Sequence, residues 1–280
     1  MLEVNDEVLN DIGRGFSVPA QPDLLIKLQK LMSEKDIDLN AIAETISQDL
    51  AVSATILKTI NSPLYGLART ICDIKKSVRY IGLNGINTLV TSSLIKQSFK
   101  QDNCSIELND FWQNASNIAN TAVYIGKNIK HNLSSEKLFT LGLFHDCGIP
   151  VMAMKYKDYQ DTLESALNTP SKTLPEIEET QYQVNHATIG FYVASSWRLP
   201  KDMCQLILRH HDRGFLYRLD GSESQLCFAI LKLSENIVHL HKHFRASSDW
   251  AYLNESVLTA LDLDEEDVQD IIEDVSEQLI

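Results

Sequence analysis

Residues that start helices, each followed by apolar residues at helical spacing, recur along this 280-residue chain. Asp38, Asp49 and Asp73 each precede such a stretch, and a short acidic side chain can accept hydrogen bonds from the free N–H groups of a first helical turn. After Asp38, the apolar residues are Leu39, Ile42, Ala43 and Ile46. Alternation of apolar and polar residues, which is typical of strands, is absent over any useful length. The sequence therefore predicts an all-α fold.

A polar segment at residues 101–109 is expected to connect two helical lobes. The second lobe is predicted to begin at Asp110, and Gly82 is predicted to end a helix within the first. Ser134 or Ser135 should cap a helix that ends near His145. A long helix is expected from about residue 176 to 197, followed by helices over residues 201–211 and 222–243.

Composition and charge exclude several classes of protein. The net charge is −13, but nine acidic residues and no Lys or Arg lie between Asp262 and Ile280, so the rest of the chain is nearly balanced. No basic stripe indicates a nucleic-acid partner. No apolar run approaches the roughly 18 residues of a membrane span, and the N-terminus has no signal-peptide pattern. Five isolated cysteines suit a reducing cytosol, so a cytoplasmic protein is expected.

The pair His145-Asp146 is the main indication of chemistry. A histidine nitrogen and a carboxylate oxygen at adjacent positions can hold one metal ion. His186 and the pair His210-His211 follow, and together they form the skeleton of a metal-dependent phosphohydrolase. The alternative is that His145 and Asp146 only form hydrogen bonds to neighbouring helices in a degenerate pocket.

Several separated motifs occur in an order that resembles a known family. They are residues 18–22 (VPAQP), 61–66 (NSPLYG), 81–83 (IGL), 111–112 (FW), 142–148 (GLFHDCG), Glu178, 186–190 (HATIG), 197–200 (WRLP) and 210–211 (HH). In these motifs the chain resembles HDOD domain proteins, the helical signalling relatives of the HD and HD-GYP metal-dependent phosphohydrolases. The resemblance implies an N-terminal segment over residues 1–17 and an HDOD domain over residues 18–213, with lobes at 18–100 and 110–213. Residues 214–280 would form a helical extension that completes the second lobe or packs on it.

The resemblance also implies a metal site and shows where this chain departs from the family. The implied ligands are His145, Asp146, His186, His210, His211 and Glu235. Imidazole ligands suit Fe, Mn or Zn. Glu235 stands where the family has a closing aspartate, and Asn114 stands where the catalytic relatives have a first histidine. Ile149 replaces a lysine that would contact phosphate, and no Gly-Tyr-Pro motif follows His211.

These departures predict a non-enzymatic bacterial signalling module with a degenerate metal pocket. Such a module would act through a signalling protein partner or a small ligand such as a nucleotide or cyclic dinucleotide. The alternative function is a metal-dependent phosphohydrolase or phosphodiesterase, in which metal-bound hydroxide would attack a phosphate ester.

Other residues are expected to have structural roles. Trp112, Trp197 and Cys147 are predicted to pack in the core. Asn61 and Ser62 are expected to end a helix, although contact with a small molecule or partner at that loop is an open alternative. The alternating histidines His239, His241 and His243 are predicted to lie on the surface, and residues 13–15 (GRG) to form a hinge.

The acidic C-terminal region has the pattern of an amphipathic helix capped by Asp264. Its apolar stripe consists of Val268, Ile271, Ile272, Val275 and Leu279. The simpler expectation is that this stripe docks on the protein's own body. The alternative is that the helix binds a basic partner through its charge.

Overall fold

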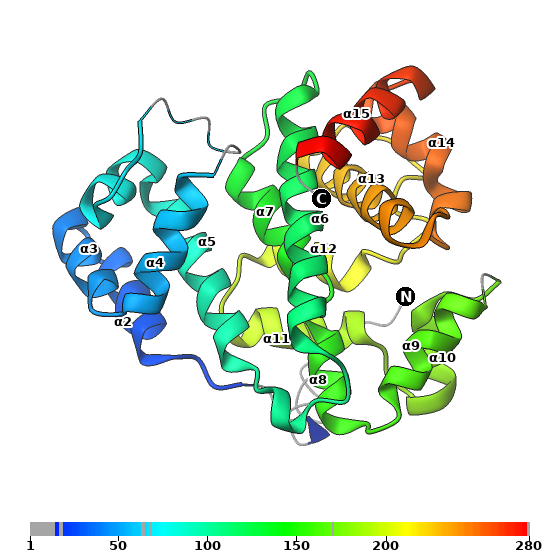
Figure 1. Ribbon diagram of the computed structural model, residues 1–280, viewed down its shortest axis with the longest axis horizontal. Helices are drawn as coiled ribbons and strands as arrows, with labels where there is room; N and C mark the ends of the chain where they lie inside the picture. The colour runs from blue at the N-terminus through cyan, green and yellow to red at the C-terminus, as the bar shows by residue number, and fades with distance from the viewer. Residues whose placement is uncertain are drawn as a thin grey trace. The chain divides into compact units, whose positions relative to one another are not determined.

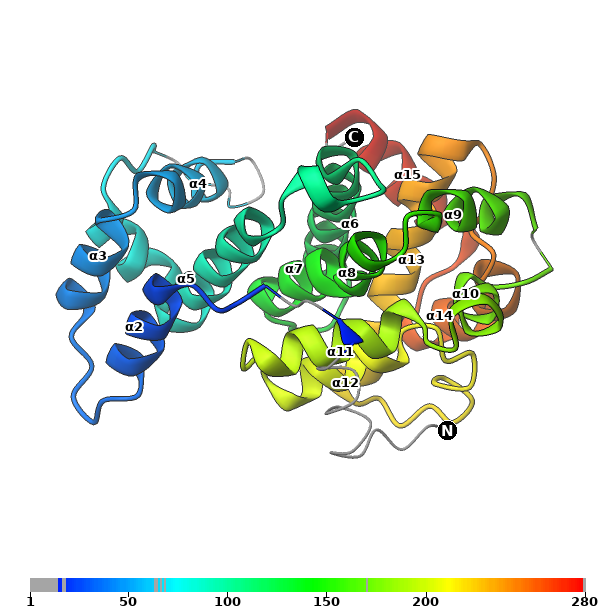
Figure 2. The same ribbon diagram turned by 90° about the horizontal axis from the view of Figure 1, so that it is seen from below.

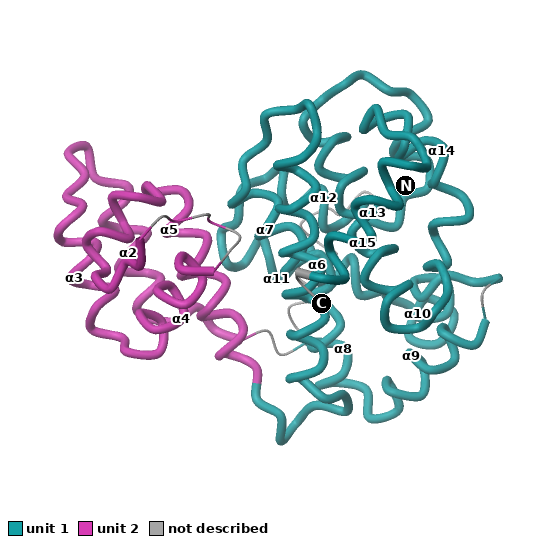
Figure 3. The backbone as a smooth tube through the Cα atoms, turned by 45° about the horizontal axis from the view of Figure 1, so that its top comes forward, with its two compact units in different colours: residues 1–18, 100–280 teal, residues 19–99 magenta. Residues whose placement is uncertain are grey.

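A computed structural model describes residues 15–16, 19–62, 65, 67, 69–169 and 171–278. In these ranges every regular element is a helix and no β-strand occurs, which confirms the all-α prediction. Among the described residues, none of the helices is both long and apolar enough to cross a lipid bilayer. The chain divides into two compact units, one over residues 19–99 and another built mainly from residues 100–280 (Figure 3).

The unit over residues 19–99 contains α2 (Asp23–Met32), α3 (Leu39–Ser47), α4 (Leu50–Ile60) and α5 (Ile74–Ser98). The caps predicted from sequence are confirmed, because Asp38, Asp49 and Asp73 each accept hydrogen bonds from the first turns of α3, α4 and α5. Gly82 interrupts α5 with a φ of 78°, a left-handed conformation that glycine adopts without steric cost. The predicted helix end at Gly82 is thus present as a kink.

Asn61 ends α4 and holds the loop that follows it. Its amide nitrogen donates to the carbonyls of Leu57 and Ile71, and its carbonyl oxygen accepts from the backbone N–H of Ile71. This supports the structural interpretation of the 61–62 segment. The other parts of two family-like motifs, namely Val18, Pro63, Leu64 and Gly66, and the predicted hinge residues Gly13 and Arg14 lie outside the described residues.

The larger unit is organised around one long helix, α6. Its elements are η2 (Gln101–Asn103), α6 (Leu108–Asn128), α7 (Ser135–Phe144), α8 (Gly148–Lys155), α9 (Tyr159–Asn168), α10 (Leu174–Tyr182), α11 (His186–Ser196), α12 (Lys201–Arg209), α13 (Glu223–His243), α14 (Trp250–Leu261) and α15 (Glu265–Gln278). Helix α6 packs against α7, α13 and α15, while α11 packs against α8 and α12 (Figures 1 and 2). Trp112, Trp197 and Cys147 are buried, as predicted.

The single helix predicted over residues 176–197 is wrong, because the chain forms two helices there. Helix α10 ends at Gln183, which adopts a left-handed conformation with a φ of 61°. The side chain of Asn185 then caps α11 by accepting from the backbone N–H of Thr188. This break makes His186 the first residue of α11, where its side chain is free to turn towards the other histidines.

The acidic C-terminal helix packs on the body of the same unit. Helix α15 contacts α6, with Ile271 and Val275 buried. The hydroxyl of Tyr124 on α6 donates to the Asp274 carboxylate at 2.5 Å, and this bond raises the pKa of Tyr124 to about 12. Asp264 accepts from the N–H of Asp267, as a cap should. Leu279, the last residue of the predicted stripe, lies outside the described residues.

Candidate metal centre

The predicted metal ligands lie at the ends of helices that meet in the larger unit. His145 is the C-terminal cap of α7, and Asp146 lies in the short turn before α8. His186 begins α11, whereas His210 ends α12 and His211 follows it. Gly148 allows the start of α8 to pack closely against the start of α11, since a Cβ atom at this position would lie 2.0 Å from the carbonyl oxygen of His186. A residue with a side chain would therefore push α11 away from Asp146.

Four of the six predicted ligands form one compact group. One donor atom from each of Asp146, His186, His210 and His211 lies within 4.8 Å of all the others. Asp146 Oδ1 is 3.3 Å from His186 Nε2 and 3.2 Å from His210 Nε2. His186 Nε2 is in turn 3.1 Å from His211 Nε2. Three imidazole nitrogens and a carboxylate oxygen at this spacing suit a transition-metal ion.

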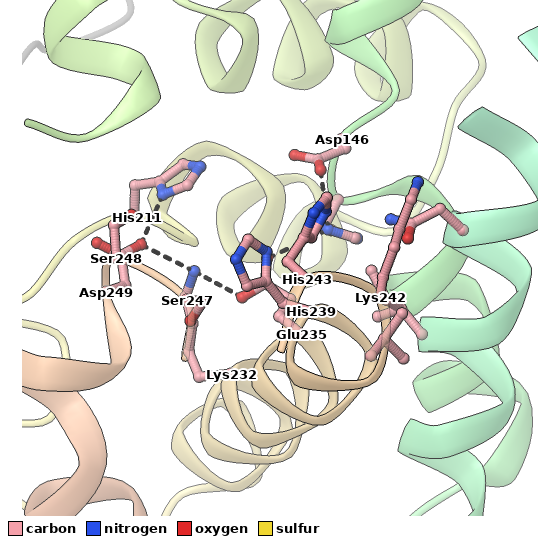
Figure 4. A pocket seen from close by; sticks show the side chains of 14 residues that line it. Asp146, His211, Lys232, Glu235, His239, Lys242, His243, Ser247, Ser248 and Asp249 are labelled. Atoms are coloured by element: carbon pink, nitrogen blue, oxygen red, sulfur yellow. Dashed lines mark hydrogen bonds and ion pairs between the residues drawn. The ribbon is translucent and has the colours of Figure 1, made fainter. Parts of the chain in front are cut away.

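Hydrogen bonds hold every histidine of the centre in the orientation that a metal ligand requires. The Nδ1 atoms of His145 and His210 lie 2.8 and 2.6 Å from the carbonyl oxygens of residues 142 and 207. The Nδ1 atom of His186 is 2.7 Å from a Glu178 oxygen. His211 Nδ1 is 2.8 Å from Asp249 Oδ2 (Figure 4). Because each acceptor holds a proton on Nδ1, Nε2 is the nitrogen that faces the group and can bind a metal when it is unprotonated.

His145 and Glu235 stand beside the four-donor group. His145 Nε2 lies 3.2 Å from Asp146 Oδ2 and 3.2 Å from Glu235 Oε1. It is buried and has no hydrogen bond of suitable geometry among the described residues. A buried ring nitrogen that faces two carboxylate oxygens but forms no well-aligned hydrogen bond to them indicates a position where a cation would be stabilised. The donor set is therefore chemically suited to the metal that was predicted from the sequence.

The charges of the centre shift the pKa values of its members. Burial opposes a positive charge on His145 and His186, but the nearby carboxylates outweigh it and raise the pKa of each to about 10. Asp146 and Glu235 act on His145, whereas Glu178 and Asp146 act on His186. Burial and the neighbouring His211 lower the pKa of His210 to about 3. Burial, chiefly, also lowers the pKa of His211. At pH 7 the metal-free centre thus combines two neutral imidazoles, His210 and His211, with two that carry an extra proton, His145 and His186.

A cavity of about 200 Å³ opens over the centre (Figure 4). Its lining includes Asn114, His145, Asp146, His211 and Glu235. Its lining also includes His239, Lys242, His243, Ser247 and Ser248. The prediction that His239 and His243 are surface residues is wrong, because both are half-buried and line this cavity. Their spacing of four residues places them on one helical face, and their rings lie 4.5 Å apart.

Comparison with known proteins now gives this arrangement a family. Residues 18–213 match the HDOD domain. The chain belongs to the HDOD domain family. An uncharacterised protein of Treponema pallidum (strain Nichols) is 27% identical over 198 residues, which cover 70% of this chain and 38% of that protein. The chain therefore spans well under half the length of this curated relative.

Solved structures share the HDOD fold. An HDOD domain protein of unknown function from Geobacter sulfurreducens has a TM-score of 0.66 at 19% identity, covering 97% of this chain and 93% of that one. A Shewanella amazonensis protein provisionally described as a metal-dependent phosphohydrolase has a TM-score of 0.67 at 19% identity, covering 98% of both chains. A Marinobacter aquaeolei protein provisionally described as a signal transduction protein has a TM-score of 0.71 at 16% identity, covering 97% of this chain and 62% of that one.

Three residues of the HDOD centre were not singled out from the sequence. Tyr159 is buried and donates its hydroxyl to Glu178, which in turn contacts His186. Asp249 holds His211, and Lys232 lines the cavity with its side chain 3% exposed. A lysine within the apolar stretch 226–233 was a usable signal, because lysine is almost never fully buried without a partner. Nothing local to Asp249 indicates that it reaches His211.

Proposed function

We propose that this HDOD protein is a bacterial regulatory module that acts by binding a ligand and a protein partner rather than by hydrolysis. Asp146, His186, His210 and His211 would hold a divalent transition metal beside the cavity. The ligand is a small phosphorylated molecule, such as a nucleotide or cyclic dinucleotide. One observation carries the proposal: Asp146 and His211 of the donor group line a cavity whose lining also carries Lys242, imidazoles and hydroxyls.

Each part of the cavity has a role in this proposal. The metal supplies a Lewis-acid contact for one oxygen of the ligand. The ammonium group of Lys242 and the hydroxyls of Ser247 and Ser248 can donate hydrogen bonds to phosphate oxygens. Glu178 and Asp249 hold His186 and His211 in place. Binding would therefore combine a fixed metal contact with a more adaptable polar surface at the mouth.

Two residues favour binding over catalysis. Asn114 lines the cavity beside His145 and Asp146, where it offers an amide, which is a poor ligand for a transition metal. Ile149 follows the His-Asp turn and is 7% exposed, so this position offers no charge to a phosphate. A phosphohydrolase or phosphodiesterase is the second candidate. It is favoured by the nearly complete donor group, in which the histidine Nε2 atoms face a common point.

Turnover and binding measurements separate the two functions. The protein would be assayed with Mn, Fe(II), Mg and Zn against cyclic dinucleotides, guanosine tetraphosphate and aryl phosphates, with Asp146→Ala as the control. We expect no turnover above that of the variant. Calorimetric titration of the metal-loaded protein with the same nucleotides should show binding that Asp146→Ala weakens. Turnover that disappears in Asp146→Ala would establish the hydrolase instead.

A further inference from the structure

Lys232 is a buried positive charge built into the metal centre. It lies on α13 with its side chain 3% exposed and lines the cavity. Its Nζ atom is 2.7 Å from Glu235 Oε2 and 3.4 Å from Asp249 Oδ2. The close-up shows these two contacts from one ammonium group (Figure 4). A lysine is buried in this way only when partners compensate the loss of its hydration.

The partners of Lys232 are the carboxylates that a second metal ion would need. Glu235 directs Oε2 to Lys232 and Oε1 to His145 Nε2 at 3.2 Å. Asp249 is shared between Lys232 and His211. In contrast, the ion pairs of Asp146 among the described residues are with histidines. The four-donor group is thus available to a metal, whereas the carboxylates beside it already hold a cation.

The charge of the cavity leads to the same conclusion. Asp146, Glu235 and Asp249 are the carboxylates in its lining. One divalent ion and the Lys232 ammonium balance these three, and the Arg213 guanidinium beside Asp249 offsets the buried Glu178 carboxylate behind His186. A second divalent ion added to Lys232 would leave an excess of positive charge in a site whose side chains are largely buried, and an unbalanced buried charge is costly.

We propose that the centre takes a single divalent ion and that the Lys232 ammonium serves as its fixed second cation. The ion is held by Asp146, His186, His210 and His211. Lys232 holds Glu235 and Asp249 in the place where a second ion would otherwise bind. This rests on the proposed function only for the presence of a metal, and it narrows the six ligands predicted from the sequence to four.

Metal stoichiometry tests the inference directly. The full chain would be loaded with Zn(II) or Mn(II), freed of excess ion by gel filtration and measured by elemental analysis. We expect one ion per chain in the natural protein. Lys232→Met keeps an unbranched side chain but removes the charge, so it should bind a second ion. Adding Glu235→Gln to that variant should restore one ion, because the second ion needs this carboxylate.

Lys137→Met is the matched control. Lys137 is also paired with two carboxylates, Asp202 and Glu223, but it does not line the cavity. This variant should keep one ion per chain. Circular dichroism would check that every variant is folded. If Lys232→Met does not fold, Glu235→Gln alone carries the test: one ion supports the inference, whereas loss of the ion contradicts it because Glu235 would then be a ligand.

The outcomes distinguish the inference from the function on which it rests. No ion in the natural protein would contradict the proposed function itself. Two ions in the natural protein would contradict only the role of Lys232, since the second cation would then bind in its presence. One ion in a folded Lys232→Met would also contradict that role, because removing the ammonium would have opened no site.

Discussion

Glu178 is the residue on which the orientation of His186 depends. It is fully buried and accepts from the backbone N–H and the ring Nδ1 of His186 at 3.0 and 2.7 Å, and also from the Tyr159 hydroxyl. Three donors thus converge on one carboxylate. A carboxylate behind a metal-binding histidine fixes the tautomer of the ring and increases its basicity. His186 therefore depends on a residue that does not itself reach the metal group.

Glu178→Gln should weaken metal binding by about 10- to 100-fold, a typical cost for losing such a partner. The Gln amide has only one oxygen. It would therefore either point its N–H group at the donors of His186 or accept only some of the hydrogen bonds that Glu178 accepts. The dissociation constant would be measured by competition with a chelator. Glu164→Gln is the control, because Glu164 is exposed on α9 and contacts Gln160. Equal affinity in Glu178→Gln and the natural protein would remove Glu178 from the centre.

Metal affinity should rise with pH. Glu178 and Asp146 overcome burial and raise the pKa of His186 to about 10, so this imidazole carries an extra proton at pH 7 in the metal-free protein. A metal ligand must be neutral, so binding releases that proton. Affinity should then increase about tenfold per pH unit for each proton released. Calorimetry in two buffers of different ionisation enthalpy gives the number of protons released on metal binding. Affinity that does not change between about pH 6 and pH 8 would contradict a protonated His186.

The sequence pattern identified the site residues that stand at adjacent positions in the chain. His145 and Asp146 were recognisable as a pair, and His210 and His211 as another. Lys232 was not recognised because its role comes from the tertiary contact with Asp249, the N-cap of α14, as well as from the local pair with Glu235. A buried lysine in an apolar stretch shows only that some partner must exist.

Among the elements, helix α15 is the one whose removal should be most informative. Ile271 and Val275 are buried against the body of the larger unit, and burial of two aliphatic side chains contributes at most about 3–6 kcal/mol. Deletion of residues 262–280 should therefore lower the unfolding temperature clearly, as measured by thermal and denaturant unfolding. Glu273→Gln combined with Glu277→Gln changes only exposed acids and should have little effect.

The opposite outcome would support a partner-binding tail. In that case the deletion would leave the unfolding temperature unchanged and abolish a salt-sensitive interaction with a basic protein.

Helix starts were predictable and one helix break was not. Asp38, Asp49 and Asp73 carry the side chains that cap helices, so their positions could be read directly. The break after α10 involves Gln183 in a left-handed conformation and contains neither glycine nor proline. The cap at Asn185 was the available signal. An amide in a continuous helical pattern is compatible both with a cap and with the interior of one helix, so the sequence alone did not decide between them.

At the scale of the whole molecule, the centre is assembled within one of the two compact units. The donors Asp146, His186, His210 and His211 all belong to the unit built from residues 100–280. Residues beyond the HDOD match at 18–213 complete the cavity, because Lys232, Glu235 and Asp249 come from the C-terminal region. A pattern search over the matched domain alone would therefore miss part of the site.

Removing the metal should loosen one unit and leave the other unchanged. A ligand stabilises the state that binds it by RT ln(1 + [L]/Kd), about 2.7 kcal/mol when the free ligand is a hundredfold above Kd. That stabilisation belongs to the elements that hold the donors. Hydrogen exchange measured by mass spectrometry, with and without chelator, should accelerate at the ends of α7, α11 and α12. Helices α2 to α5 contribute no donor to the group, so their exchange should not change. Acceleration throughout residues 19–99 would show instead that the metal stabilises both units together.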